Sequence, residues 1–337
     1  MPIARPSLAR KCELPSGRNA TGTPLRYTRH FLATLPPMIF PSVPLFDTQF
    51  LTRLEYLSLV SRKVFQGELM AQRRTTQTGS GVEFADHRQY ATGDDFRYLD
   101  WNLYARHGEL LLKRFQEEED LHVYILLDCS RSMSVSDSVR FDLARQLTAA
   151  LAYVAMSDLD RVAVFAFADG VLDHFPLTRG KERILSLMEW LDNLQVSGET
   201  TSLKNLTNQF VQRGHRKGLA ILISDFYDPQ GFRPGLDLLR HHGYEPSVVQ
   251  LHSPEEANPK LLGDVELADV ETGEVRKLTV TENSLQRYRD RFNQFLGELT
   301  SYCTSYGIDC TISNTSVAFD DLLLAMMRST DRPAPTR

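Results

Sequence analysis

Three polar side chains follow an apolar run in the segment "LLDCSRSMS" (residues 126–134). Asp128, Ser130 and Ser132 occupy every second position where the run ends. A short, nearly continuous apolar run is typical of a strand that is buried on both faces. A tight loop after such a strand would present one carboxylate and two hydroxyl oxygens on the same side. Hard oxygen ligands suit Mg²⁺, Mn²⁺ or Ca²⁺, which makes the segment a candidate part of a cation site. A plain turn with a helix cap is the structural alternative for this segment taken alone.

Two later segments offer more oxygen ligands. The loop "SGETTSLK" (197–204) is rich in hydroxyls, and "ISDF" (223–226) ends a second apolar run with Asp225. With only two carboxylates, the ion would keep net positive charge and several waters. Such an ion can accept one more anionic ligand, an Asp or Glu of a partner protein.

The elements that position these residues alternate between strands and helices. Apolar runs predict strands over 122–128, 161–169, 218–226, 245–253 and 309–315. Helical spacing predicts helices over 137–156, 181–194, 203–214, 231–243, about 282–305 and 317–329. A hairpin is expected at 264–280, around "ETGE". This order predicts an α/β fold, a doubly wound and mostly parallel sheet flanked by helices. Ligands of such sheets bind at the carboxyl ends of the strands, where Asp128 and Asp225 lie.

The three polar segments together resemble the metal-ion-dependent adhesion site of von Willebrand factor A domains. "DCSRS" fits the Asp-x-Ser-x-Ser motif, Asp225 fits the Asp of the third loop, and "TSL" fits Thr-x-Leu. The resemblance makes Thr201 the second-loop ligand, with Thr200 as an open alternative. It implies Mg²⁺, or else Mn²⁺ or Ca²⁺, in a protein-binding module that is not an enzyme. The implied metal ligands are Asp128, Ser130, Ser132, Thr201 and Asp225.

The segment before this region is similar to the family called domain of unknown function 58. The similarity covers roughly residues 47–330 and implies a von Willebrand A-like domain after a β-rich segment. It also implies a MoxR-type AAA+ ATPase as partner, in protein maturation or complex assembly. Many relatives carry two membrane helices before the signature, whereas this sequence shows none. The matching residues in 79–120 are Gly81, Glu83, Phe84, Arg88, Tyr90, Gly93, Asp94, Arg97, Asp100, Trp101, Ala105, Arg106 and Glu119.

Four parts of the chain are expected. Residues 1–46 are rich in Arg, Pro, Thr and Ser and predict a disordered tail or a start codon assigned too early; a transit peptide is the alternative. Residues 47–120 hold a helix within 47–72, capped by Asp47 or Thr48, a loop at "TTQTGSG", and the signature segment. Residues 121–330 form the von Willebrand A-like domain, and 331–337 a second disordered tail.

Two other functions compete with metal-dependent protein binding. Five acids in 79–120 suggest a metal-dependent phosphoesterase or nuclease. They are Glu83, Asp86, Asp94, Asp95 and Asp100. The structural alternative is an ion-pair network with Arg88, Arg97 and Arg106, backed by Trp101 and Tyr90. The other competing function is a structural scaffold whose metal site is degenerate.

Composition narrows the class of protein further. A net charge of −5 argues against a general nucleic-acid binder, and no window reaches the ~20 apolar residues of a membrane span. The four cysteines form no CxxC pair, so we expect reduced thiols in a cytoplasmic protein, with Cys129 packed in the core. The sequence contains neither a P-loop nor a Gly-x-Ser-x-Gly nucleophile elbow.

Overall fold

The computed structural model describes residues 45–65, 74–77, 83–118, 121–134, 139–198, 200–268 and 275–329. Its centre is a six-stranded sheet in the order β11-β8-β7-β4-β5-β6. Strands β4 (His122–Asp128), β5 (Arg161–Phe167), β7 (Leu219–Ser224), β8 (Glu245–His252) and β11 (Asp309–Asn314) run parallel. Strand β6 (Val171–Arg179) pairs antiparallel with β5 at one edge. The predicted mixed α/β fold with a mostly parallel central sheet is therefore confirmed, with β6 as an unpredicted addition.

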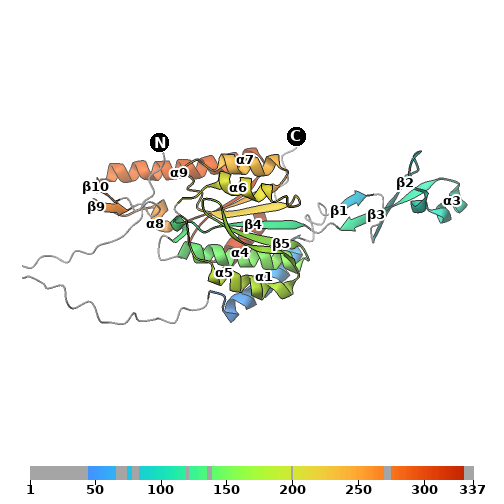
Figure 1. Cartoon of the computed structure of the whole chain (residues 1–337), viewed down its shortest axis with the longest axis horizontal. Helices are drawn as coiled ribbons and strands as arrows, with labels where there is room; N and C mark the ends of the chain where they lie inside the picture. Colours follow the sequence, from blue (N-terminus) through green and yellow to red (C-terminus); the bar gives the residue numbers. More distant parts are fainter. Residues whose placement is uncertain are drawn as a thin grey trace, which may run out of the picture.

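Helices cover both faces of this sheet (Figure 1). Helices α1 (Thr48–Phe65), α4 (Val139–Ser157), α5 (Ile184–Asn193) and α10 (Phe319–Ser329) supply side chains to the core on one face. Helices α6 (Leu203–Gln212), α7 (Arg233–His241) and α9 (Glu282–Ser305) supply them to the core on the other. Each expected helix of the region 137–329 is present, within a few residues of the predicted ends.

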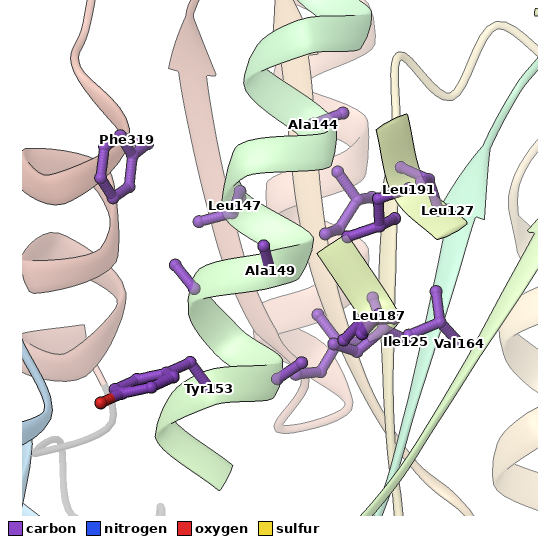
Figure 2. Close-up of a cluster of buried hydrophobic side chains, with 14 of the residues drawn as sticks. Ile125, Leu127, Ala144, Leu147, Ala149, Tyr153, Val164, Leu187, Leu191 and Phe319 are labelled. Carbon is purple, nitrogen blue, oxygen red and sulfur yellow. The ribbon is translucent and has the colours of Figure 1, made fainter. Parts of the chain in front are cut away.

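The central strand β4 contributes to both cores because its side chains alternate in direction. Ile125 and Leu127 pack toward α4 and α5, as Figure 2 shows, whereas Tyr124 and Leu126 belong to the opposite core. Every residue of β4 is buried. A strand buried on both faces is what the continuous apolar run predicted.

Helices α6 and α7 approach each other closely at a glycine. A Cβ on Gly235 would lie 2.9 Å from Cβ of Leu203 and 3.0 Å from its backbone carbon and oxygen. Only a residue without a side chain fits at this distance. The contact holds the first residue of α6 in place, directly after the loop that carries Thr201.

A smaller antiparallel sheet precedes the main body of the protein (Figure 1). It has the order β1-β3-β2, with β1 at Arg74–Gln77, β2 at Glu83–Gln89 and β3 at Leu111–Glu118. The short helices η1 (Phe96–Tyr98) and α3 (Trp101–His107) lie between β2 and β3. The expected loop at "TTQTGSG" is wrong at its start, because residues 74–77 pair with β3.

The remaining elements are short or peripheral. They are η2 (Arg131–Ser134), η3 (Lys181–Arg183), α8 (Pro254–Ala257) and the hairpin of β9 (Gly263–Ala268) with β10 (Val275–Val280), which confirms the expected hairpin. Asp47 caps α1 as expected, accepting a hydrogen bond from the amide of Phe50 at 2.7 Å. Within the described residues, no helix combines the length and apolar character needed to cross a bilayer. The expected tails lie almost wholly outside the described residues, which begin at 45 and end at 329.

Candidate functional site

Asp128 is the last residue of β4 and is completely buried. Its Oδ1 accepts a hydrogen bond from the amide of Ser130 at 2.8 Å, and its Oδ2 accepts one from the hydroxyl of Ser224 at 2.5 Å. Ser224 ends the neighbouring strand β7, which pairs with β4 in parallel register. The two strand ends therefore meet at the side chain of Asp128.

The two predicted serine ligands lie side by side in the loop after β4. The Oγ atoms of Ser130 and Ser132 are 2.9 Å apart and share a hydrogen bond. Both side chains are buried, although Ser132 lies within the short helix η2. The loop thus gathers two hydroxyl oxygens next to the carboxylate that precedes them.

Asp225 follows β7 and is bound to a buried arginine. Arg140, near the start of α4, donates through Nη1 to Oδ2 of Asp225 at 3.0 Å and to the backbone oxygen of Ser132 at 3.2 Å. Its Nη2 donates to Oε2 of Glu256. Arg140 and Asp225 are fully buried, and Glu256 is nearly so. One guanidinium thereby ties together η2, α4, the end of β7 and α8.

The turn after β7 is tight and uses an unusual backbone conformation. Phe226 has φ of 60°, a left-handed value that non-glycine residues rarely adopt. The amide of Phe226 donates to Oγ of Ser224 at 2.9 Å, and the amide of Tyr227 donates to Oδ1 of Asp225 at 3.0 Å. Such strain is maintained where the surrounding contacts fix it, and here it orients the Asp225 carboxylate.

The hydroxyl-rich loop closes over the same edge of the sheet. The amide of Ser197 donates to the backbone oxygen of Cys129 at 2.7 Å, and that of Ser202 to Ala168 at 2.9 Å. Thr201 lies between them, buried, and its Oγ1 has no hydrogen-bond partner. Thr200 is exposed, so burial favours Thr201 of the two predicted alternatives.

Burial and charge act together on the acids of this site. Burial raises the pKa of the Asp128 carboxyl to about 7, and the negative charge of Asp225 adds to the effect. Burial alone would lower the pKa of Arg140, but Glu256 and Asp225 outweigh it and hold that pKa above its usual range. Burial, and then the charge of Arg140, lower the pKa of nearby His252 to about 4.

The oxygen atoms of this site match a hard cation in their chemistry. Among the described residues, no group of three or more His, Cys, Asp or Glu side chains is placed to hold a metal. The site instead offers two carboxylates and three hydroxyls, which is the chemistry of a hard cation with retained waters. The unpaired Oγ1 of Thr201 and the raised pKa of Asp128 both mark oxygen atoms that a cation would stabilise. These residues fit Mg²⁺, Mn²⁺ or Ca²⁺ better than a metal that prefers nitrogen or sulfur ligands.

Sequence reasoning missed Arg140, Glu256 and Ser224. Arg140 stands three, four and seven residues before Leu143, Ala144 and Leu147, so it interrupts the apolar stripe of α4. A charge on an apolar stripe is a signal for a buried ion pair. Glu256 belongs to a capping box with Ser253, in which each side chain accepts from the other residue's amide. That pattern is visible in the sequence "SPEE".

Three acids of the signature segment, Asp94, Asp95 and Asp100, lie within ion-pair distance of basic side chains. Arg88 donates through two nitrogens to Asp94, at 2.8 and 2.6 Å, and Arg97 pairs with Asp95. Asp100 caps α3 and contacts His87 and Lys113. These contacts agree with the ion-pair alternative for Arg88 and Arg97. The expected backing by Trp101 is wrong, because that ring is 59% exposed; Tyr90 stacks on Phe96.

The cysteines within the described residues are free thiols, and Cys129 is buried in the core as expected. Burial raises the pKa of its thiol above the usual range. A buried thiol of this kind is unreactive, so Cys129 adds packing to the site edge but no chemistry.

The chain belongs to the family described as "Protein of unknown function DUF58", which it matches over residues 86–297. This range begins within β2 and ends within α9, and so includes β3 and all five candidate ligands. Uncharacterized proteins of Mycobacterium tuberculosis and Mycobacterium bovis are 23% identical to it over 239 residues, which are 69% of this chain and 75% of theirs.

Several solved structures resemble the chain weakly. Protein BatB from Bacteroides thetaiotaomicron covers 62% of this chain and 97% of its own at 17% identity, with a TM-score of 0.38. An aerotolerance-related membrane protein from Bacteroides fragilis covers 62% of this chain and 98% of its own at 16% identity, with a TM-score of 0.39. An uncharacterized membrane spanning protein from Vibrio fischeri covers 63% and 100% at 15% identity, with a TM-score of 0.23.

The expected cytoplasmic location does not stand. Two of the matched structures are described as those of membrane proteins, a description that belongs to those proteins. The expectation rested on reduced cysteines and the lack of an apolar span, and neither feature fixes a compartment.

Proposed function

We propose that this chain is a metal-dependent protein-binding module with a von Willebrand factor A-like domain, and not an enzyme. Asp128, Ser130, Ser132, Thr201 and Asp225 would hold Mg²⁺, some of them through water. Mn²⁺ and Ca²⁺ are the alternatives with the same oxygen preference.

The observation that carries the proposal is the buried, unpartnered hydroxyl of Thr201. A buried polar atom without a partner costs about 1–3 kcal/mol, so native proteins rarely keep one without a reason. Here it belongs to a loop whose backbone is bonded to Cys129 and Ala168, the residues that follow β4 and β5. A cation at this edge would satisfy that oxygen.

The charge balance of the site supports the same ion. Arg140 is compensated by Glu256 and Asp225, whereas the described partners of the buried Asp128 carboxylate are neutral, the amide of Ser130 and the hydroxyl of Ser224. When bound, a divalent ion would supply that charge and a coordination position for a carboxylate from outside. The chain buries these side chains and orients them. It pairs Asp225 with Arg140 and leaves Asp128 with neutral hydrogen-bond donors.

The partner would contribute an Asp or Glu side chain. A MoxR-type AAA+ ATPase is the partner that the family resemblance implies, and protein maturation or complex assembly is the corresponding process.

Affinity capture from a lysate of the source organism tests this proposal. Wild type and Asp128→Ala are compared in Mg²⁺ and in EDTA, with Asp169→Ala as the matched control because Asp169 is an exposed carboxylate just after β5. We expect an AAA+ ATPase, identified by mass spectrometry, to be retained by wild type and Asp169→Ala only in Mg²⁺. Identical partners for all variants in both buffers would contradict metal-bridged binding at this site.

A further inference from the structure

A second polar site lies at the amino ends of the strands of the central sheet, opposite to the ends that carry Asp128 and Asp225. A cavity of about 270 Å³ is lined by His122, Tyr124, Arg161, Leu177, His215 and Arg216. His122 and Arg161 are the first residues of β4 and β5 and are partners in the parallel register. The cavity therefore opens at the amino ends of the strands, a full strand length from Asp128.

The lining residues share one face of the sheet. His122 and Tyr124 are two residues apart on β4 and point the same way, toward the core that contains Phe210 of α6. His215 and Arg216 come from the loop between α6 and β7. Leu177 of β6 completes the wall as an apolar side chain.

The chemistry of the lining is basic. Two arginines and two histidines stand among the six lining residues, and those six include no carboxylate. Arg213, three residues before Arg216, lies over the ring of Phe165 at 5.4 Å from its centre and adds further positive charge to this end of the sheet. A set of this kind favours anions, and arginine matches phosphate oxygens in geometry as well as charge.

The loop that supplies His215 and Arg216 is fixed by tyrosine hydroxyls. The hydroxyl of Tyr124 donates to the backbone oxygen of Arg216 at 2.8 Å, and that of Tyr244 donates to the backbone oxygen of His215 at 3.0 Å. The His215 ring lies 5.5 Å from the ring of Tyr124 and 5.5 Å from that of Phe210. The backbone of the pocket is thus held before any ligand arrives, which lowers the cost of binding.

One polar atom of the lining residues remains unsatisfied. Nε2 of His215 is buried and has no hydrogen-bond partner. Burial lowers the pKa of His215, and the charges of Arg213 and His174 lower it further. A bound anion would counter those charges and accept a hydrogen bond from the imidazole.

We propose that this pocket binds a small phosphate-bearing anion, either inorganic phosphate or a small phosphate monoester. The tetrahedral group would be reached by Arg216 and His215 from the loop and by Arg161 and His122 from the strand ends. The volume of the cavity is just below the 300–1,000 Å³ of typical ligand pockets. This size restricts the ligand to the phosphate and a few attached atoms. The site is independent of the proposed metal centre.

Calorimetric titration of the full chain with inorganic phosphate, and separately with O-phosphoserine, tests this site. EDTA is present throughout, so that phosphate does not bind through a metal ion. Arg216→Ala removes an exposed lining guanidinium, and His215→Phe removes the unsatisfied nitrogen while keeping an aromatic ring. Lys217→Ala is the matched control, because Lys217 is the next residue, basic and exposed, but not part of the lining.

We expect wild type and Lys217→Ala to bind alike, and Arg216→Ala and His215→Phe to bind at least about tenfold more weakly. Tighter binding of O-phosphoserine than of phosphate would identify a monoester site, and the reverse order a phosphate site. The proposal is overturned if wild type binds neither probe at millimolar concentration. It is also overturned if Lys217→Ala weakens binding as much as Arg216→Ala does, since the attraction would then be that of a basic loop in general.

Discussion

At the scale of single residues, the most consequential side chain of the candidate site is Arg140. It is fully buried and binds two carboxylates and a backbone oxygen that come from three other elements. Removing one partner from a buried ionic group is costly because the other charges stay behind without compensation.

Replacing this arginine is expected to destabilise the fold. Arg140→Met should lower the free energy of unfolding by about 3–5 kcal/mol, because Asp225 and Glu256 lose their shared cation. Arg140→Met combined with Glu256→Gln should recover part of that loss, since one buried charge fewer is unpaired. Urea denaturation measures both, with Glu255→Gln as the exposed control. A loss below about 1 kcal/mol for Arg140→Met would show that the network contributes little.

Asp128 is expected to reduce stability when no metal is present. Its pKa in the folded chain is about 7, above the roughly 3.9 of an unfolded chain, so the folded state holds the proton longer. Stability of the metal-free protein should therefore fall as pH rises from about 4 to about 7. Asp128→Asn lacks this dependence and should be more stable than wild type in EDTA at pH 8, by about 1–3 kcal/mol.

Chemical denaturation at pH 5 and pH 8 in EDTA tests this expectation. Wild type should lose stability relative to Asp128→Asn between the two pH values. An equal change in the free energy of unfolding between pH 5 and pH 8 for the two proteins would mean that Asp128 does not carry the buried charge.

Sequence reasoning named the candidate ligands of this site but not the residues that contact them. Asp128, Ser130, Ser132 and Asp225 were predicted because polar residues at strand ends are visible as interruptions of apolar runs. Arg140 was missed although it lies on the apolar stripe of α4, because its partners are far away in the sequence. Asp225, Glu256 and the backbone oxygen of Ser132 together compensate its buried charge.

At the scale of elements, helix α4 is followed by a leucine in the left-handed conformation that glycine usually adopts at a helix end. Leu159 follows the helix with φ of 64° and is 54% exposed. The amide of Asp160 donates to the oxygen of Ala155, so the left-handed residue is part of the helix stop. Glycine is the residue that adopts this conformation without steric cost.

Leu159→Gly should stabilise the protein by about 0.5–1 kcal/mol, because it relieves the left-handed strain. Asp158→Gly is the matched control; its φ is not positive, so glycine there should be destabilising by a similar amount. Thermal denaturation of the two variants distinguishes them. A destabilised Leu159→Gly would indicate that its side chain contributes more by packing than it costs in strain.

Elements with mixed exposure were the hardest to predict. Strand β6 carries Pro176 and is exposed along most of its length, which suits an edge strand but breaks any apolar pattern. Strand β1 is formed of polar residues and exists because β3 pairs with it. Strand β4 was predicted to the residue, and β5, β7 and β8 to within two residues at each end, since both faces of these strands are apolar.

At the scale of the whole molecule, the two hydrophobic cores meet at β4 and β7, so stability should be highest there. Amide hydrogen exchange should be slowest in β4 and β7 and faster by orders of magnitude in β9 and β10, whose hairpin is largely exposed. Mass spectrometry of the exchanged peptides gives this ranking directly. Comparable protection of the hairpin would mean that it is covered by another molecule in solution.

The whole molecule is also polar at both ends of one sheet. Oxygen-bearing side chains surround Asp128 at the carboxyl ends of the strands, and cationic groups surround His215 at their amino ends. The family match spans both ends, so relatives offer a comparison for both proposed sites.

The central claim is that the carboxyl edge binds a divalent cation, and calorimetric titration of Mg²⁺ into EDTA-stripped protein tests it most directly. The account predicts one Mg²⁺ bound per chain by wild type and by the control Asp169→Ala. It predicts none for Asp128→Ala and much weaker binding for Thr201→Val, a variant of the same shape that removes only the unpartnered hydroxyl. No binding by wild type at millimolar Mg²⁺, or wild-type affinity in Thr201→Val, would contradict the account.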